Sequence, residues 1–176
     1  MSQQKVPRRF GGLTIIQTMT ILAILGVALF FALSLFKKEA APAVTFKMLN
    51  GEQVTTASLK GKVVLVNFWA TSCSTCIAEM PDMVDTYNKF QGRGLELIAV
   101  AMNYDPPNYV LNYAQTRDLP FKVALDTDGS AAKSFGDVKL TPTTFLIDKE
   151  GNIVKRYVGK PEFPALHQLL EKSLAA

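Results

Sequence analysis

The chain has 176 residues, of which 48% are hydrophobic, and a formal net charge of +4 at neutral pH. Lys5, Arg8 and Arg9 near the N-terminus supply three of these four charges, so the rest of the chain is nearly neutral. Because it has no long basic run, the composition argues against nucleic acid as a partner. The length predicts one domain and an appendage.

A long uncharged stretch, Leu13 to Phe36, comes first in the chain. It contains 24 residues, and about 20 apolar residues cross the hydrocarbon core of a bilayer as a helix. We therefore predict a tail over residues 1–12, a transmembrane anchor over residues 13–36, a linker over residues 37–43 and one domain over residues 44–176. The alternative is a cleaved signal peptide, but its apolar region usually has only about 7–15 residues.

The basic residues that flank the stretch favour one orientation in the membrane. Three precede it, whereas only Lys37 and Lys38 follow it closely. Because basic residues are enriched on the cytoplasmic side of a membrane span, this difference favours a cytoplasmic N-terminus. We therefore expect a single-pass protein of the cytoplasmic (inner) membrane whose C-terminal domain faces the periplasm or outer side.

The apolar pattern after residue 44 predicts an α/β fold, a mixed sheet flanked by helices. Asn50-Gly51 predicts a hairpin turn within residues 44–56. The nearly continuous apolar runs over residues 63–68 and 95–102 predict strands that are buried on both faces. Further strands are predicted over residues 123–125, 144–147 and 153–158, and helices over residues 73–90, 105–117, 130–135 and 163–174.

Cys73 and Cys76 are the only cysteines of the chain. They lie where a buried strand gives way to a helix, and the N-terminus of a helix favours a thiolate. A thiolate with a second thiol one turn away can attack a disulfide and then be released by its neighbour. We therefore expect Cys73 to be the nucleophile and Cys76 the resolving thiol. The alternative is that the two cysteines only pack in the core. A structural zinc site needs about four ligands, and the two cysteines with His167, the only histidine, would not supply them.

Glu79 follows Cys76 by three residues, so a helix places it within one turn of that thiol. A carboxylate there could give or take the proton that thiol exchange requires, and burial would raise its pKa. The alternative is an exposed acid that only stabilises the helix dipole.

Several motifs together resemble the thioredoxin fold. They are Phe68-Trp69-Ala70-x-x-Cys73-x-x-Cys76, the later Pro81, and Thr141-Pro142 before a strand. Asn67, the run Cys76-x-x-Glu79-x-Pro81 and the apolar N-terminal stretch are similar to the TlpA/ResA-type membrane-anchored thiol–disulfide oxidoreductases. The resemblance covers about residues 44–174.

The resemblance implies roles for further residues. Thioredoxin places its buried acid where Asn67 stands, so Glu79 would serve instead. Thr141-Pro142 has the position of the cis-proline of the fold, which lies beside the thiols and leaves the neighbouring backbone free to pair with a substrate. Trp69 could cover the disulfide or pack in the core. The resemblance implies that it is partly exposed next to the site and contacts substrate together with Thr141 and Pro142.

The function implied is the reduction of disulfides in exported proteins, such as apocytochrome c before haem attachment. Electrons would come from a membrane donor of the DsbD/CcdA kind, since the outside of the cell is oxidising. The redox-active disulfide Cys73–Cys76 would suffice, with no metal or organic cofactor. Two alternatives stay open, namely a thiol peroxidase and a membrane-held chaperone or scaffold without redox turnover.

Overall fold

The fold is seen in a computed structural model that describes residues 15–35 and 38–176. These residues form two units, the helix α1 (Ile15–Leu35) and a compact domain that begins at Lys38. No helix among the described residues was identified as long and apolar enough to cross a membrane. The anchor over residues 13–36 stays a prediction, and its residues 13, 14 and 36, like the tail over residues 1–12, lie outside the described part.

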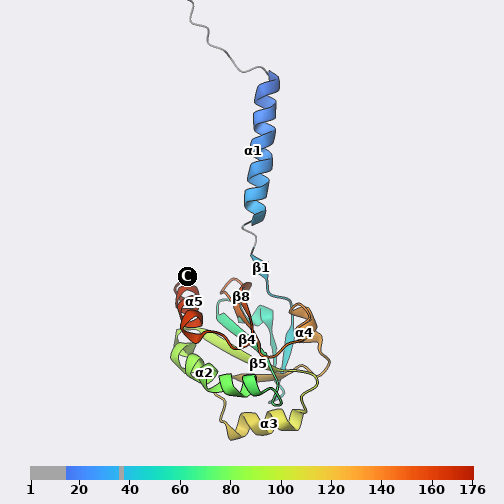
Figure 1. Cartoon of the computed structure of the whole chain (residues 1–176), viewed down its shortest axis with the longest axis vertical. Helices are drawn as coiled ribbons and strands as arrows, with labels where there is room; N and C mark the ends of the chain where they lie inside the picture. The colour runs from blue at the N-terminus through green and yellow to red at the C-terminus, as the bar shows by residue number, and fades with distance from the viewer. Residues whose placement is uncertain (1–14, 36–37) are drawn as a thin grey trace, which may run out of the picture. The chain divides into compact units, whose positions relative to one another are not determined.

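The domain is built on a mixed sheet with helices on both faces, which confirms the predicted α/β fold (Figure 1). Within the described residues the strand order is β1-β8-β7-β4-β5-β6-β2-β3. The strands are β1 (Glu39–Ala40), β2 (Thr45–Met48), β3 (Gln53–Thr55), β4 (Val63–Trp69), β5 (Leu95–Ala101), β6 (Lys122–Leu125), β7 (Thr143–Ile147) and β8 (Asn152–Val158). The helices are α2 (Ser74–Phe90), α3 (Pro107–Thr116), α4 (Ser130–Ser134) and α5 (Phe163–Ala175), with short 3-10 turns η1 (Thr56–Leu59) and η2 (Gln91–Arg93).

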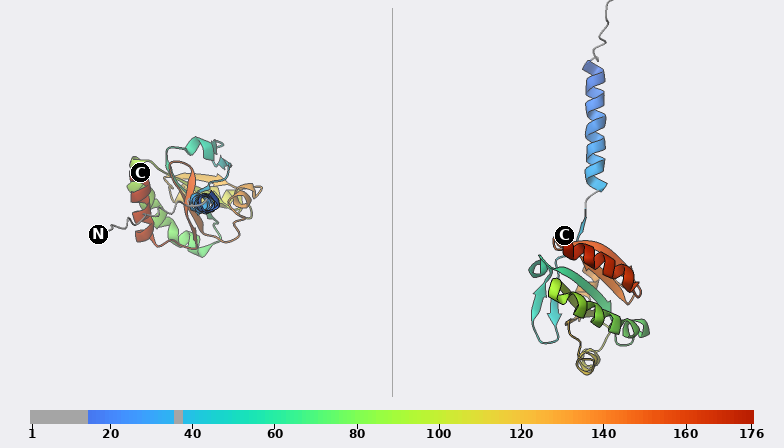
Figure 2. Two further views of the ribbon diagram at one scale, coloured as in Figure 1. Left: turned by 90° about the horizontal axis from the view of Figure 1, so that it is seen from above. Right: turned by 90° about the vertical axis from the view of Figure 1, so that its left-hand side faces the viewer.

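Strand β4 lies at the centre of the sheet and determines what each face contains. All seven of its residues are buried, as its continuous apolar run predicts. It pairs in parallel with β5 and antiparallel with β7. Because side chains alternate along a strand, Leu65 and Trp69 pack under α2 and α5, whereas Val66 and Phe68 face α4. Figure 2 shows α2 and α5 side by side on one face.

The hairpin predicted around Asn50-Gly51 is present as β2 and β3, and Gly51 has the positive φ of 85° that such a turn favours. The predicted linker over residues 37–43 contains structure that its sequence did not indicate. Glu39 and Ala40 pair with β8, and Lys38 forms an ion pair of 2.8 Å with Asp148. From Lys38 onward, therefore, the chain is attached to the domain.

Candidate active site

The two cysteines lie where β4 ends and α2 begins, as predicted. The N–H of Cys73 donates to the carbonyl of Ala70 (3.1 Å), which closes a tight turn, and Cys73 is the N-cap of α2. Its Sγ accepts the backbone N–H of Cys76 at 3.2 Å. Such a hydrogen bond stabilises a thiolate once the disulfide is reduced.

Cys73 and Cys76 form a disulfide, with their Cα atoms 5.2 Å apart. Cys76 is fully buried, whereas Cys73 is only partly buried. A partner molecule can therefore reach Cys73 but not Cys76. This asymmetry agrees with the roles expected from the sequence, in which Cys73 attacks and Cys76 resolves.

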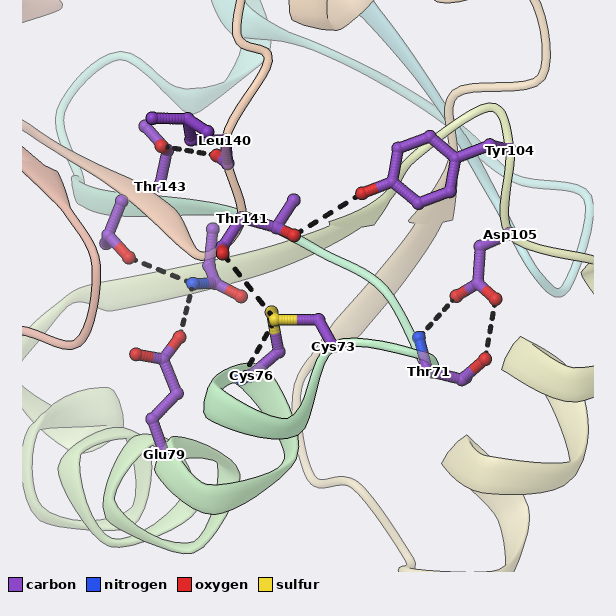
Figure 3. Close-up of a disulfide and its surroundings, with 11 residues drawn as sticks. Thr71, Cys73, Cys76, Glu79, Tyr104, Asp105, Leu140, Thr141 and Thr143 are labelled. Carbon is purple, nitrogen blue, oxygen red and sulfur yellow. Dashed lines mark hydrogen bonds between the residues drawn. A yellow bond between two sulfur atoms is a disulfide. The ribbon is translucent and has the colours of Figure 1, made fainter.

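The Thr141–Pro142 peptide bond is cis, as the resemblance implied. The carbonyl oxygen of Thr141 lies 3.5 Å from Sγ of Cys73, so this loop borders the disulfide directly (Figure 3). On its other side, the carbonyl of Pro142 accepts the N–H of Gly159 at 2.8 Å. Thr141 is thus half-buried beside the partly exposed Cys73, whereas Pro142 is buried.

Glu79 points from α2 into the interior, and its side chain is completely buried. The Nδ2 of Asn67 donates to Oε1 of Glu79 and to Oγ1 of Thr144, each at 2.9 Å. The alternative of an exposed acid at the start of the helix is therefore wrong. A carboxyl group one turn from Cys76 is held inside the protein by a single amide.

Burial raises the pKa of Glu79 from its usual 4.5 to about 7, against the opposing effects of the Asn67 hydrogen bond and the Lys160 charge. Asp82 adds a smaller effect in the same direction as burial. Among the described residues, Oε2 of Glu79 and Oδ1 of Asn67 have no hydrogen-bond partner. A carboxyl group that exchanges its proton near neutral pH is well suited to general acid–base catalysis.

Trp69 does not lie as the resemblance implied. The expectation of partial exposure is wrong, because its exposed fraction is 0%. Tyr113 of α3 covers the indole, with ring centroids 5.3 Å apart. Trp69 is therefore a core residue beneath the thiols and cannot contact a substrate in this conformation.

A loop between β5 and α3 completes the surroundings of the disulfide, and the sequence did not reveal it. Asp105 accepts the backbone N–H of Thr71 at 2.6 Å and its hydroxyl at 2.5 Å. The hydroxyl of Tyr104 lies 3.3 Å from Oγ1 of Thr141 (Figure 3). This loop thus contacts the segments on both sides of the disulfide. The only signal was Asp105-Pro106-Pro107, which we interpreted as a helix start.

Two exposed large side chains adjoin Thr141, namely Leu140 (66% exposed), which precedes it in the chain, and Tyr104 (55% exposed), which contacts it. They lie on opposite sides of Thr141 (Figure 3). Large exposed apolar side chains beside a reactive group are typical of a surface that binds another molecule.

His167 has a structural position. Its Nε2 lies 2.9 Å from Oγ1 of Thr86, and its ring packs against Phe90 with centroids 5.3 Å apart. Burial lowers its pKa, an effect increased by the charge of Lys89. Across the described residues, no group of three or more His, Cys, Asp or Glu side chains could hold a metal ion.

Comparison with known proteins places this geometry in a family context. Residues 37–170 match the model of the Redoxin family. The thiol-disulfide oxidoreductase ResA of Bacillus cereus (strain ATCC 10987) is 36% identical over 161 residues, which cover 86% of this chain and 92% of that protein. ResA of Bacillus subtilis (strain 168) is 34% identical over 137 residues, or 78% of this chain and 75% of that protein.

Solved structures give the same picture. A thiol:disulfide interchange protein of the thioredoxin family from Chlorobium tepidum is similar with a TM-score of 0.71 and 29% identity, over 78% of this chain and 97% of that one. The thioredoxin domain of a thiol-disulfide oxidoreductase from Bacteroides vulgatus has a TM-score of 0.66 and 27% identity, over 76% of this chain and 96% of that one.

Proposed function

Since the chain belongs to the Redoxin family and is a thiol–disulfide oxidoreductase of the TlpA/ResA type, we propose that it reduces disulfides of exported proteins. The observation that carries this proposal is the asymmetry of the disulfide. Cys73 is accessible and accepts a helix N–H, whereas Cys76 is buried one turn further along α2. That arrangement suits one attacking and one resolving thiol.

The reaction starts from the reduced dithiol. The thiolate of Cys73 attacks one sulfur of the substrate disulfide, whose S–S bond breaks, and the departing substrate sulfur takes up a proton. Cys76 then loses its proton and attacks Sγ of Cys73, which releases the second substrate thiol and restores the Cys73–Cys76 disulfide. In total two electrons and two protons pass to the substrate.

Glu79 would accept the proton of Cys76 in the second step. Cys76 is buried, so bulk water has little access to its thiol. Glu79 lies one turn further along the same helix, and burial raises its pKa to about 7. The pKa of an unperturbed thiol is about 8.5, so a base with a pKa near 7 reduces the energy needed to ionise it.

The substrate would bind as an extended segment along Thr141. Its backbone would pair with the cis-proline loop, as extended peptides pair with exposed backbone in other complexes. Leu140 and Tyr104, both exposed, would contact the side chains next to the substrate cysteine.

Cysteines of apocytochrome c are the substrate class that the ResA relatives suggest, and a membrane donor of the DsbD/CcdA kind would return electrons to the Cys73–Cys76 disulfide. The uncharged stretch Leu13 to Phe36 supports a tether in the cytoplasmic membrane, with the domain on the periplasmic or outer side. A reporter fused after Ala176 should be active only in the exported compartment. Activity in the cytoplasm would contradict this topology.

The surroundings of two arginines argue against a thiol peroxidase, which would need a cation beside the reactive thiol. Arg93 forms an ion pair of 2.6 Å with Glu171, and the guanidinium of Arg117 lies 5.8 Å from the ring centroid of Tyr113. Peroxide consumption should therefore be slow relative to disulfide exchange.

Reduction of a peptide disulfide by the reduced protein tests the proposal. Cys73→Ser should lower the rate at least about a thousandfold, because serine offers no thiolate at neutral pH. Ser74→Ala, a change at an exposed position between the cysteines, is the matched control and should leave the rate nearly unchanged. A binding protein or scaffold without redox turnover would show no reduction in the parent chain either.

A further inference from the structure

The feature of the site without an assigned role is Asp105, an acid that is only 4% exposed. Both of its carboxylate oxygens are bonded to one residue, Thr71, through the backbone N–H at 2.6 Å and the hydroxyl at 2.5 Å. Thr71 lies in the turn that runs from Ala70 to Cys73, which we call the thiol loop. A buried carboxylate therefore holds the loop that carries the attacking cysteine.

The segment that presents Asp105 is itself attached to the sheet. The N–H of Asp105 donates to the carbonyl of Met102 at 2.9 Å, and the N–H of Met102 donates to the carbonyl of Trp69 at 3.0 Å. The end of β4 and the acid that holds the thiol loop thus form one closed set of hydrogen bonds. Such a set limits the positions that Cys73 can adopt.

The charge of Asp105 has a second consequence. Consecutive Cα atoms are 3.8 Å apart, so the two residues from Thr71 to Cys73 keep the carboxylate within roughly 14 Å of the thiol. Because Asp105 is nearly excluded from water, its negative charge is poorly screened on its own side and disfavours a second negative charge on the thiol. A dithiol whose thiolate is less stabilised is a stronger reductant.

We propose that Asp105 is a positioning residue for the thiol loop, and that its buried negative charge opposes the Cys73 thiolate and keeps the dithiol reducing. This inference rests on the proposed function, since it concerns the same pair of thiols. Asp105 does not touch the reacting sulfur atoms; it positions the loop through Thr71, and its charge acts on the thiol across space.

Other charged and polar groups around Cys73 also affect how stable its thiolate is. Glu79 on α2 is the second buried acid, and Tyr104 on the β5–α3 loop contributes a hydroxyl that reaches Thr141. The cations on the neighbouring loops have acidic partners, Asp137 for Lys139 at 3.0 Å and Asp82 for Lys160 at 2.6 Å. The two buried acids therefore act in the same direction on the thiol, and the helix N–H that Cys73 accepts acts in the opposite direction.

A matched control exists within the chain. Asp126 is also 4% exposed, and its two oxygens accept the backbone N–H groups of Ala131 and Ala132, each at 2.9 Å. It thus has the burial of Asp105 and, like it, one hydrogen bond to each oxygen, but both donors are backbone N–H groups and it holds α4 instead of the thiol loop. Asp126→Asn reports what the loss of a buried carboxylate does to the fold alone.

The experiment measures alkylation of Cys73 against pH in the full chain carrying Cys76→Ala. Asp105→Asn should shift the midpoint of the pH profile of the alkylation rate to lower pH. Below that midpoint it should raise the alkylation rate about threefold to tenfold. Asp126→Asn should leave the midpoint and the rate unchanged. A midpoint for Asp105→Asn equal to or above that of Asp126→Asn would overturn the proposal.

Thr71→Val covers the case in which Asp105→Asn does not fold. It keeps the charge of Asp105 but removes the hydroxyl that partly neutralises it, so the midpoint should shift to higher pH, opposite to the effect of Asp105→Asn. A shift to lower pH would count against a role for the charge. Disulfide reduction by the parent dithiol is measured alongside: no reduction there contradicts the proposed function, whereas an unshifted midpoint contradicts only the role of Asp105.

Discussion

The two faces of the central sheet are formed by the same strands, but they differ in whether their buried polar atoms have hydrogen-bond partners. On one face, which we call the thiol face, β4 presents Leu65, Asn67 and Trp69 beneath α2 and α5. On the other, the aromatic face, it presents Val66 and Phe68 toward α4. The thiol face contains the disulfide and Glu79, whereas neither cysteine lies on the aromatic face.

The buried polar atoms without partners follow the same division. Among the described residues they are Asn67 Oδ1, Trp69 Nε1, Glu79 Oε2 and the hydroxyl of Tyr157, and each belongs to the thiol face. By contrast, Asp126 beside α4 has both oxygens bonded. An unpaired buried polar group lowers the free energy of unfolding by about 1–3 kcal/mol. The unpaired groups therefore reduce stability on the face that contains the reactive disulfide.

The aromatic face should therefore carry stability without carrying activity. Phe68 packs against Phe135 and Phe145, with ring centroids at 5.4 and 6.0 Å. Phe68→Ala should lower the free energy of unfolding by about 3–5 kcal/mol, because it removes a ring from a packed core. Chemical denaturation measures the loss, and Phe68→Leu should lose less.

The disulfide-exchange rate of Phe68→Ala, measured at a temperature where it is folded, should equal that of the parent chain. A large drop in the rate of the folded variant would show that the two faces are coupled. It would contradict the view that the aromatic face contributes stability but not activity.

Glu79 should make stability depend on pH in a direction unusual for an acid. Its folded pKa of about 7 lies above the unfolded value near 4.5, so the folded state binds the extra proton between these values. The stability present below pH 4.5 is then lost as the pH rises toward 7, by about 3 kcal/mol. Glu79→Gln should remove this pH-dependent loss of stability. It should also make the disulfide-exchange rate depend less on pH near pH 7.

Glu96 provides the control of opposite sign. Burial raises its pKa, but hydrogen bonds from Lys122 and Lys62 outweigh burial and hold the pKa below its usual value. Its contribution is present above the unfolded pKa and is lost as the pH falls through the lower folded pKa, so Glu96→Gln should be less stable than the parent chain above about pH 4.5, and the difference should shrink at lower pH. Denaturation midpoints of both variants across about pH 2 to 8 separate the two signs. If Glu79→Gln has the pH dependence of the parent chain, Glu79 does not titrate as described.

The smallest effect concerns Trp69. Trp69→Phe removes an indole N–H that has no partner among the described residues, but also removes part of the packing against Tyr113. These effects oppose one another, so the free energy of unfolding should change by no more than about 1 kcal/mol. A loss above about 3 kcal/mol in thermal or chemical denaturation would mean that the N–H has a partner.

The sequence predicted the features of the site that depend on local patterns. The strand-to-helix junction at Cys73 follows from a buried run and a helical period, and the spacing of Glu79 from Cys76 places both on one helix. The cis bond before Pro142 followed from the family resemblance. Each of these depends on a short stretch of the chain.

The features that the sequence missed depend on contacts between distant segments. Trp69 is buried because Tyr113, 44 positions later, covers it, and Asp105 reaches the thiol loop across a separation of 34 residues. Neither contact has a periodic or motif signal. The pairing of Glu39 and Ala40 with β8 was missed for the same reason.

Trapping of a mixed disulfide tests most directly the central claim that Cys73 attacks and Cys76 resolves. Reduced Cys76→Ala and Cys73→Ala variants of the full chain would be mixed with a peptide disulfide, and the covalent adducts identified by mass spectrometry. We expect a stable adduct on Cys73 in the Cys76→Ala variant and little or none on Cys76 in the Cys73→Ala variant, because Cys76 is fully buried. Adducts that form on Cys76 as fast as on Cys73 would contradict that claim.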